Sequence, residues 1–198
     1  MTENKTLQEL SYLADDFFIL ILLEKSLGNI QNMGANNRAL PWVSSHVLEL
    51  SLKATCIHFK KQYFGHNLRN LWDQVKSKFN NQNIWPEPKY FEIYKKVFIP
   101  QENEQVISGL PIPDNLQRAE LAYWIDNVTN LKYGIDKNDL MISTVHLGYV
   151  GLSKAFLDLF KGLRNTYKTE ALNNRYRKQI EAKFTDPTHA NNLIGLLI

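Results

Sequence analysis

The stretch YFGHNLRNL, residues 63–71, places a histidine directly in front of a segment with leucines at helical spacing. Histidine exchanges a proton readily near neutral pH, so His66 is a candidate for acid or base catalysis. A structural role also fits, because glycine reaches left-handed φ cheaply and a polar side chain can cap exposed backbone N–H groups. We expect Gly65 and His66 to form a helix-to-helix corner, with a direct chemical role of His66 as the alternative.

A second polar group lies in the apolar segment just before this corner. Glu49 and Lys53 are four residues apart, the favourable orientation for an ion pair on a helix, and His46 belongs to the same stripe. The pair is either a solvent-exposed ion pair or a polar seam against a partner.

The sequence lacks the motifs of the common catalytic and cofactor sites. It has no glycine-rich phosphate loop and no Gly-x-Ser-x-Gly motif, and its five histidines show no metal-ligand spacing. The single cysteine, Cys56, lies in an apolar run and is predicted to be a core residue rather than a reactive thiol. We therefore expect neither a metal nor a cofactor.

Positive charge gathers in two segments, although the formal net charge is only +3. Residues 53–78 hold six basic residues and one acidic residue, and residues 154–183 hold eight and three. On a shared face they would attract phosphate, with Tyr167 and Tyr176 available to stack on bases, whereas separate solvated lysine faces are the alternative. The candidate binding residues are Glu49, Lys53, Arg69, Arg164, Arg175 and Arg177.

Apolar residues recur at helical spacing along most of the chain. This spacing predicts helices at residues 6–27, 41–63, 66–79, 114–128, 137–164 and 169–184. The second is apolar around much of its girth and is predicted to be central to the core. Residues 80–113 hold five of the seven prolines and are predicted to be an insertion or long ordered connection, with a short strand or helix at 90–99.

The inward face of the first predicted helix follows from the spacing of its leucines. The positions expected to face the core are Leu7, Leu10, Leu13, Phe17, Leu20 and Leu27. The final stretch NNLIGLLI, residues 191–198, is expected either to pack back on the bundle or to fray.

Length and composition favour one domain over residues 1–198, and the helical spacing of its apolar residues predicts that this domain is all-α. The N-terminus lacks the features of a signal peptide, and the apolar run at 17–23 is far shorter than the ~20 residues that span a bilayer. We expect no membrane association and a cytoplasmic location, which a chain with one cysteine also fits.

Residues 46–72, HVLELSLKATCIHFKKQYFGHNLRNLW, resemble the core of HEPN-type helical domains. In these domains a helix with Glu and then Lys-Ala leads through a Gly-His corner into a leucine-rich helix. NLKYG at 130–134 resembles an aromatic turn found later in such domains. The resemblance implies an up-and-down helical bundle that forms a homodimer. The matching positions are Glu49, Leu52, Lys53, Ala54, Gly65, His66, Leu68 and Leu71.

Many HEPN relatives are metal-independent ribonucleases that combine arginine and a polar residue with a histidine a few residues later. There the histidine can handle the 2′-hydroxyl proton while the arginine holds the phosphate. Arg164 and Asn165 match the start of that motif, but the expected histidine positions hold other residues. The resemblance therefore favours an RNA-associated binding module over an enzyme.

Two other functions stay open at this point. One is a metal-independent ribonuclease in which His66 or His146 joins Arg164 and Asn165. The other is a purely structural interaction protein, in which Arg164 and Asn165 are a solvated helix end with favourable charge near its C-terminus.

Overall fold

The structure is a computed structural model that describes residues 3–28, 39–79, 85, 121, 125 and 154–198. These residues form helices, turns and loops, and no strand occurs among them. The predicted all-α class is confirmed for this part of the chain. The helices are α1 (Glu3–Gly28), α2 (Ala39–His58), α3 (Leu68–Val75), the 3-10 turn η1 (Lys76–Lys78), α7 (Lys154–Tyr167), α8 (Glu170–Lys183) and α9 (Pro187–Ile194).

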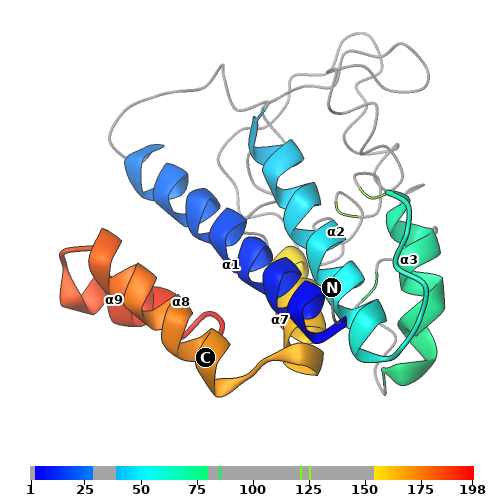
Figure 1. The fold of residues 1–198 in the computed structure, drawn as a ribbon. Coiled ribbons are helices and arrows are strands. Elements are labelled where there is room, and N and C mark those ends of the chain that lie inside the picture. The colour runs from blue at the N-terminus through cyan, green and yellow to red at the C-terminus, as the bar shows by residue number, and fades with distance from the viewer. Residues whose placement is uncertain (1–2, 29–38, 80–84, 86–120, 122–124, 126–153) are drawn as a thin grey trace, which may run out of the picture.

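The long helices α1 and α2 lie side by side at the centre, and α7 also packs against α2 (Figure 1). On one side, α3 packs on the end of α2, and on the other α8 and α9 form a pair that meets α1. The parts of the two predicted basic segments that lie on α3 and α8 therefore do not share one face, because these helices lie on opposite sides of the α1–α2 pair. Within the described ranges no helix combines the length and apolar character needed to cross a membrane.

The predicted central position of the second helix is confirmed. Val47, Leu48 and Leu52 on α2 are fully buried, because this helix has neighbours on several sides. It ends at His58 and not at 63. Lys60 adopts φ 55°, and the N–H groups of residues 60 and 61 donate to the carbonyl oxygens of 57 and 56. This is a Schellman C-cap, which stops the helix without a glycine.

The predicted inward face of α1 is wrong at two positions. Leu13 and Leu20 are 45% and 51% exposed. The buried face is rotated and carries Asp15 together with apolar side chains, because the apolar run at 17–23 offers hydrophobic residues on every side of the helix. Its fully or almost fully buried apolar members are Ala14, Phe18, Ile19, Ile21 and Leu22.

Helix α8 confirms the boundaries predicted for the helix at 169–184, whereas α9 was not predicted. Thr169 caps α8 by accepting a hydrogen bond from the N–H of Leu172 at 3.1 Å. Asp186 caps α9, and Pro187 occupies its first turn. Leu197 is only 1% exposed, so the end of the chain packs back on the core.

Several sequence predictions fall outside the described residues. These are the insertion at 80–113, the helix at 114–128 and the part of the 137–164 helix that precedes α7. Three single positions are exceptions: Trp85, Leu121 and Ile125 are described, and all three are buried in the same hydrophobic cluster as the helices.

Candidate functional site at the corner between α2 and α3

The predicted corner is present between α2 and α3. Gly65 has φ +93°, in the left-handed region that favours glycine. The cap of α3 is Asn67, whose side-chain oxygen accepts a hydrogen bond from the N–H of Asn70 at 2.9 Å. The capping role considered for His66 therefore belongs to the next residue.

His66 instead contacts the predicted ion pair on α2. Its Nδ1 lies 2.8 Å from Oε1 of Glu49, and Nζ of Lys53 donates to the same oxygen at 2.6 Å. Nδ1 of His46 lies 3.7 Å from the other carboxylate oxygen. We call these four residues the Glu49 cluster. Because Glu49 is 12% exposed and Lys53 16%, the pair is a polar seam within the chain and not a solvent-exposed bridge.

The Glu49 cluster can orient an imidazole. The Glu49 carboxylate accepts from one ring nitrogen, and His66 is 84% exposed, which leaves the rest of the ring to solvent. A carboxylate holds a catalytic histidine in the same way. The ammonium of Lys53 also donates a hydrogen bond to the Glu49 carboxylate. Among the described residues, no group of three His, Cys, Asp or Glu side chains could hold a metal ion.

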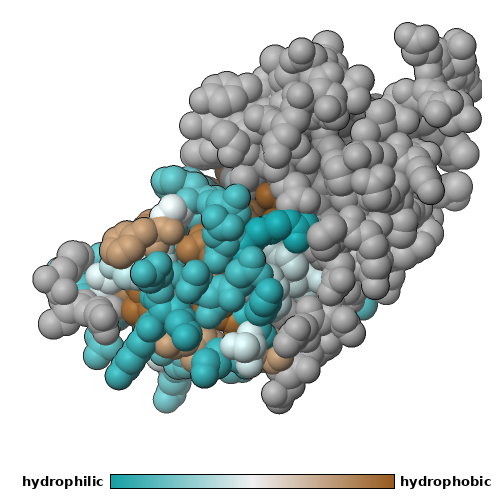
Figure 2. All heavy atoms as spheres, turned by 90° about the vertical axis from the view of Figure 1, so that its right-hand side faces the viewer, coloured by the Kyte–Doolittle hydropathy of each residue, from teal (hydrophilic) through white to brown (hydrophobic). Residues whose placement is uncertain are grey.

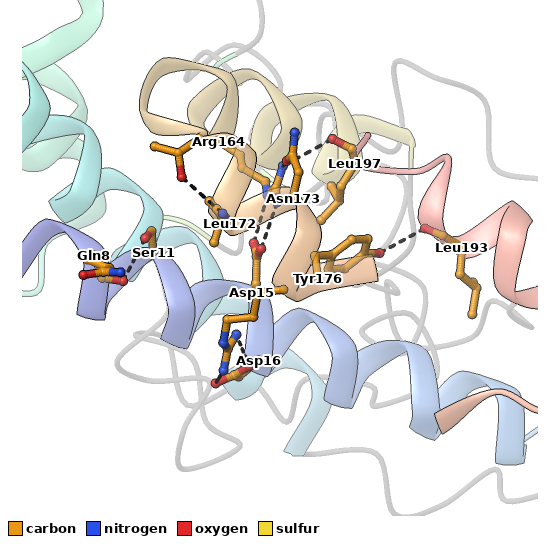
Figure 3. Close-up of polar contacts among 12 residues, drawn as sticks. Gln8, Ser11, Asp15, Asp16, Arg164, Leu172, Asn173, Tyr176, Leu193 and Leu197 are labelled. Atoms are coloured by element: carbon orange, nitrogen blue, oxygen red, sulfur yellow. Dashed lines mark hydrogen bonds and ion pairs between the residues drawn. The ribbon is translucent and has the colours of Figure 1, made fainter. Parts of the chain in front are cut away.

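The predicted phosphate-binding arginine has a different role (Figure 3). Arg164 is 1% exposed, and its Nε and one terminal nitrogen donate to the two carboxylate oxygens of Asp15, each at 2.9 Å. The other terminal nitrogen donates to Oδ1 of Asn173 at 2.8 Å and to the carbonyl oxygen of Leu197 at 3.3 Å. Arg164 is therefore neither a solvated helix end nor a surface phosphate ligand, because the core satisfies its donors.

Burial governs the electrostatics around Arg164. Burial raises the pKa of the Asp15 carboxyl, because it disfavours the charged form. The hydrogen bonds from Arg164 lower this pKa, because they stabilise the carboxylate. Burial also raises the pKa values of Tyr167 and Tyr176, which are 4% and 0% exposed. The predicted availability of these two rings for stacking on bases is wrong, because they are part of the core.

The second arginine of this region also pairs with α1. Arg175 contacts the Asp16 carboxylate at 2.7 and 2.8 Å and lies 4.6 Å from the ring centre of Tyr12. The hydrogen bond from Arg175 to Asp16 is the main cause that raises the pKa of the guanidinium. Adjacent aspartates on α1 thus each hold one arginine, Arg164 from α7 and Arg175 from α8.

The remaining predicted site residues do not come together. Asn165 is exposed on α7 beside the buried Arg164, and His146 lies outside the described residues. Arg69 is half-buried on α3, whereas Arg177 is exposed on α8, on the opposite side of the molecule. Of the predicted binding residues, only Glu49 and Lys53 meet each other.

The loop between the two helices carries features that sequence reasoning missed. Phe64 is 79% exposed and stacks on Tyr63, with ring centres 4.6 Å apart and planes at 28°. A surface hollow of about 270 Å³ adjoins the stack. The side of the molecule on which α3 lies is otherwise largely hydrophilic where it is described (Figure 2). The hollow is lined by Ile57, Lys60, Lys61, Gln62, Tyr63 and Phe64.

A second, larger hollow of about 470 Å³ runs along α8. It is basic and has no aromatic ring among its described lining residues. These are Ala171, Asn174, Arg175, Lys178, Gln179, Ala182 and Lys183.

Comparison with known proteins finds no relative from which a function could be inferred. The chain matches no family model, no curated protein and no solved structure. The strongest contrast in the described residues is between an arginine enclosed by the core and a basic, aromatic loop on the surface.

Proposed function

We propose that this chain is a cytoplasmic, HEPN-like helical bundle that binds RNA without cleaving it. The observation that carries the proposal is the burial of Arg164 against Asp15. The resemblance assigns this arginine to the phosphate of a ribonuclease site, but its donors are directed to acceptors inside the core. A guanidinium held in this way cannot also reach an RNA backbone.

The charge around the α2–α3 corner supports RNA as the ligand. Between Glu49 and Asp73 the sequence has no acidic residue, and the carboxylate of Glu49 is already occupied by Lys53 and His66. Lys60 and Lys61 are exposed in the loop. Accessible ammonium groups attract phosphate and release its counterions, which makes the binding salt-dependent.

One observation favours the ribonuclease alternative. The contact between His66 and Glu49 could orient the ring as a general base for a 2′-hydroxyl group. This alternative needs a different cation for the phosphate, since Arg164 is enclosed. A cleavage assay therefore has to accompany any binding assay.

The test is fluorescence anisotropy of a labelled single-stranded RNA with purified protein and a chelator, followed by a denaturing gel of the same samples. We expect affinity that falls as salt rises, and intact RNA on the gel. The double variant Lys60→Gln/Lys61→Gln should bind more weakly than Lys178→Gln/Lys183→Gln, which removes equal charge from the hollow on α8. Cleavage that disappears in His66→Ala would overturn the non-catalytic proposal, and absence of binding would overturn the RNA proposal.

We also propose that the protein is a homodimer, as the HEPN resemblance implies. The support from the structure is the outward face of α1, where Leu13 and Leu20 lie two turns apart and are 45% and 51% exposed. Light scattering across a range of concentrations should give the dimer mass. The variant Leu13→Glu/Leu20→Glu should give the monomer, and a monomeric wild-type protein would contradict this part of the proposal.

A further inference from the structure

The exposed position of Phe64 follows from how the chain turns between α2 and α3. The Schellman cap at Lys60 ends α2, and the chain then returns to α3 through the loop of residues 59–67. Phe59 and Tyr63 are half-buried and pack against the core, and these contacts hold the loop against the helices. Phe64 follows Tyr63 directly and precedes the left-handed Gly65, and it is 79% exposed.

The Phe64 ring is held in place although it lies in solvent. It stacks on Tyr63 at a centroid distance of 4.6 Å and an interplanar angle of 28°, and Tyr63 contacts the core. Most of the ring surface that Tyr63 does not cover is open to water. A ring that is already oriented loses little conformational freedom when a second flat group stacks on it.

The surroundings of this ring favour a nucleic acid over a protein. Lys60 and Lys61 line the same hollow as Phe64, and no carboxylate is among the lining residues that the structure describes. Lysine is depleted in protein–protein interfaces. Lysines that track a backbone beside an aromatic ring that takes a base are the usual elements of a site for single-stranded nucleic acid.

We propose that the Tyr63–Phe64 stack is a binding site for one unpaired base of an RNA strand whose phosphates contact Lys60 and Lys61. The proposal rests on the RNA binding proposed above and specifies its site and the single-stranded form of its ligand. A base inside a duplex is already stacked on both faces, so the Phe64 ring favours an unpaired base over the bases within a duplex. Stacking is tolerant of sequence because every base has a π face.

The test compares substitutions of Phe64 by anisotropy with a labelled single-stranded RNA. Phe64→Leu keeps an apolar side chain of similar size but removes the π face, and we expect affinity to fall about tenfold. Phe64→Trp should bind at least as tightly as the wild type, with added tryptophan fluorescence that is quenched by the RNA. Both variants should keep the wild-type circular dichroism, because the side chain is 79% exposed. The same RNA annealed into a duplex should bind more weakly than the single strand.

The outcomes separate this proposal from the broader one. If Lys60→Gln/Lys61→Gln weakens binding while Phe64→Leu leaves it unchanged, the stacking site is overturned and RNA binding stands. If the wild type binds no RNA, both proposals are overturned. If Phe64→Leu instead changes the mass measured by light scattering, with RNA affinity unaltered, the ring serves an interface between two copies of the chain and the stacking site is overturned.

Discussion

The two regions in which the sequence gathers positive charge are built in opposite ways. In α7 and α8, Arg164 and Arg175 each contact a carboxylate of α1, and Arg164 is buried. Figure 3 shows the contact between Arg164 and Asp15. In the loop before α3, Lys60 and Lys61 are exposed beside an exposed aromatic ring. The first arrangement joins helices, and the second leaves charge available to a ligand.

The difference shows that the partner of a charge decides its role, and that local composition does not identify the partner. Asp15 and Arg164 are 149 positions apart in the chain. Adjacent aspartates on α1 each contact one arginine, and these contacts bring α7 and α8 to the same turn of α1. Some of the basic residues in 154–183 therefore serve to pack α7 and α8 against α1.

The largest effect that tests this comparison is the loss of the buried pair. Arg164→Ala would leave the Asp15 carboxylate uncompensated in the core, and we expect the free energy of unfolding to fall by about 3–5 kcal/mol. Urea denaturation followed by circular dichroism measures it. The double variant Asp15→Leu/Arg164→Leu removes both charges and should recover much of the stability.

The same variant can also break the comparison. If Arg164→Ala keeps wild-type stability and loses RNA affinity, Arg164 is a binding residue and the two basic regions have the same role. Loss of binding in an unfolded Arg164→Ala sample would carry no such meaning, so its denaturation curve must accompany every binding measurement.

Much of the helical frame was predictable, because amphipathic spacing and caps are local. The predicted helix at 169–184 agrees with α8, and Leu68, Leu71 and Val75, which recur at helical spacing in the predicted helix at 66–79, are buried on α3. The buried face of α1 was not predictable in this way, because apolar residues occur on every side of this helix. Two adjacent aspartates inside that apolar helix were the available signal for buried charge pairs.

The surface site was hidden for a different reason. Ile57, Phe59 and Tyr63 continue an apolar pattern that extended the predicted second helix to residue 63. The helix ends earlier because Lys60 adopts a left-handed conformation, which glycine usually supplies. A lysine gives no such signal, so the predicted second helix was extended to residue 63, and only residues 64 and 65 were left between it and the next predicted helix.

The next effect concerns the polar residues of the corner. Asn67→Ala removes the acceptor for the N–H of Asn70 and should lower the free energy of unfolding by about 1 kcal/mol. His66→Asn should change it less, because the His66 side chain is 84% exposed. Thermal unfolding of the two variants side by side measures this order. A larger loss in His66→Asn would mean that the Glu49 cluster, and not Asn67, holds the corner.

A smaller effect is expected at the second arginine of α8. Arg175→Gln loses its contacts with Asp16 and Tyr12, but the pair is 28% and 37% exposed, so solvent screening limits the cost to about 1 kcal/mol or less. RNA affinity should stay close to that of the wild type. Anisotropy titrations of Arg175→Gln and Lys61→Gln, which remove equal charge, provide the comparison. If Arg175→Gln weakens binding more, the RNA site lies on α8.

The last prediction tests whether the core beneath the loop between α2 and α3 is closed to solvent. Cys56 lies on α2 beneath the corner, is fully buried, and its Sγ donates weakly to the carbonyl oxygen of Leu71 at 3.6 Å. Burial raises the pKa of the thiol to about 11 from 9.0. At pH 8 this shift alone reduces the thiolate fraction about hundredfold, and iodoacetamide reacts with the thiolate.

Mass spectrometry should therefore find Cys56 almost unlabelled in the native protein at pH 8 and fully labelled in urea. The sign of the pH effect on stability also follows. A thiol whose pKa is raised in the folded state stabilises the fold fully below pH 9, and this contribution is lost as pH rises through about 11. The raised pKa values of Tyr167 and Tyr176 act in the same direction. Rapid native labelling would show that the corner opens, and the exposed Phe64 would then belong to a loosely packed end of α2 and not to a fixed binding surface.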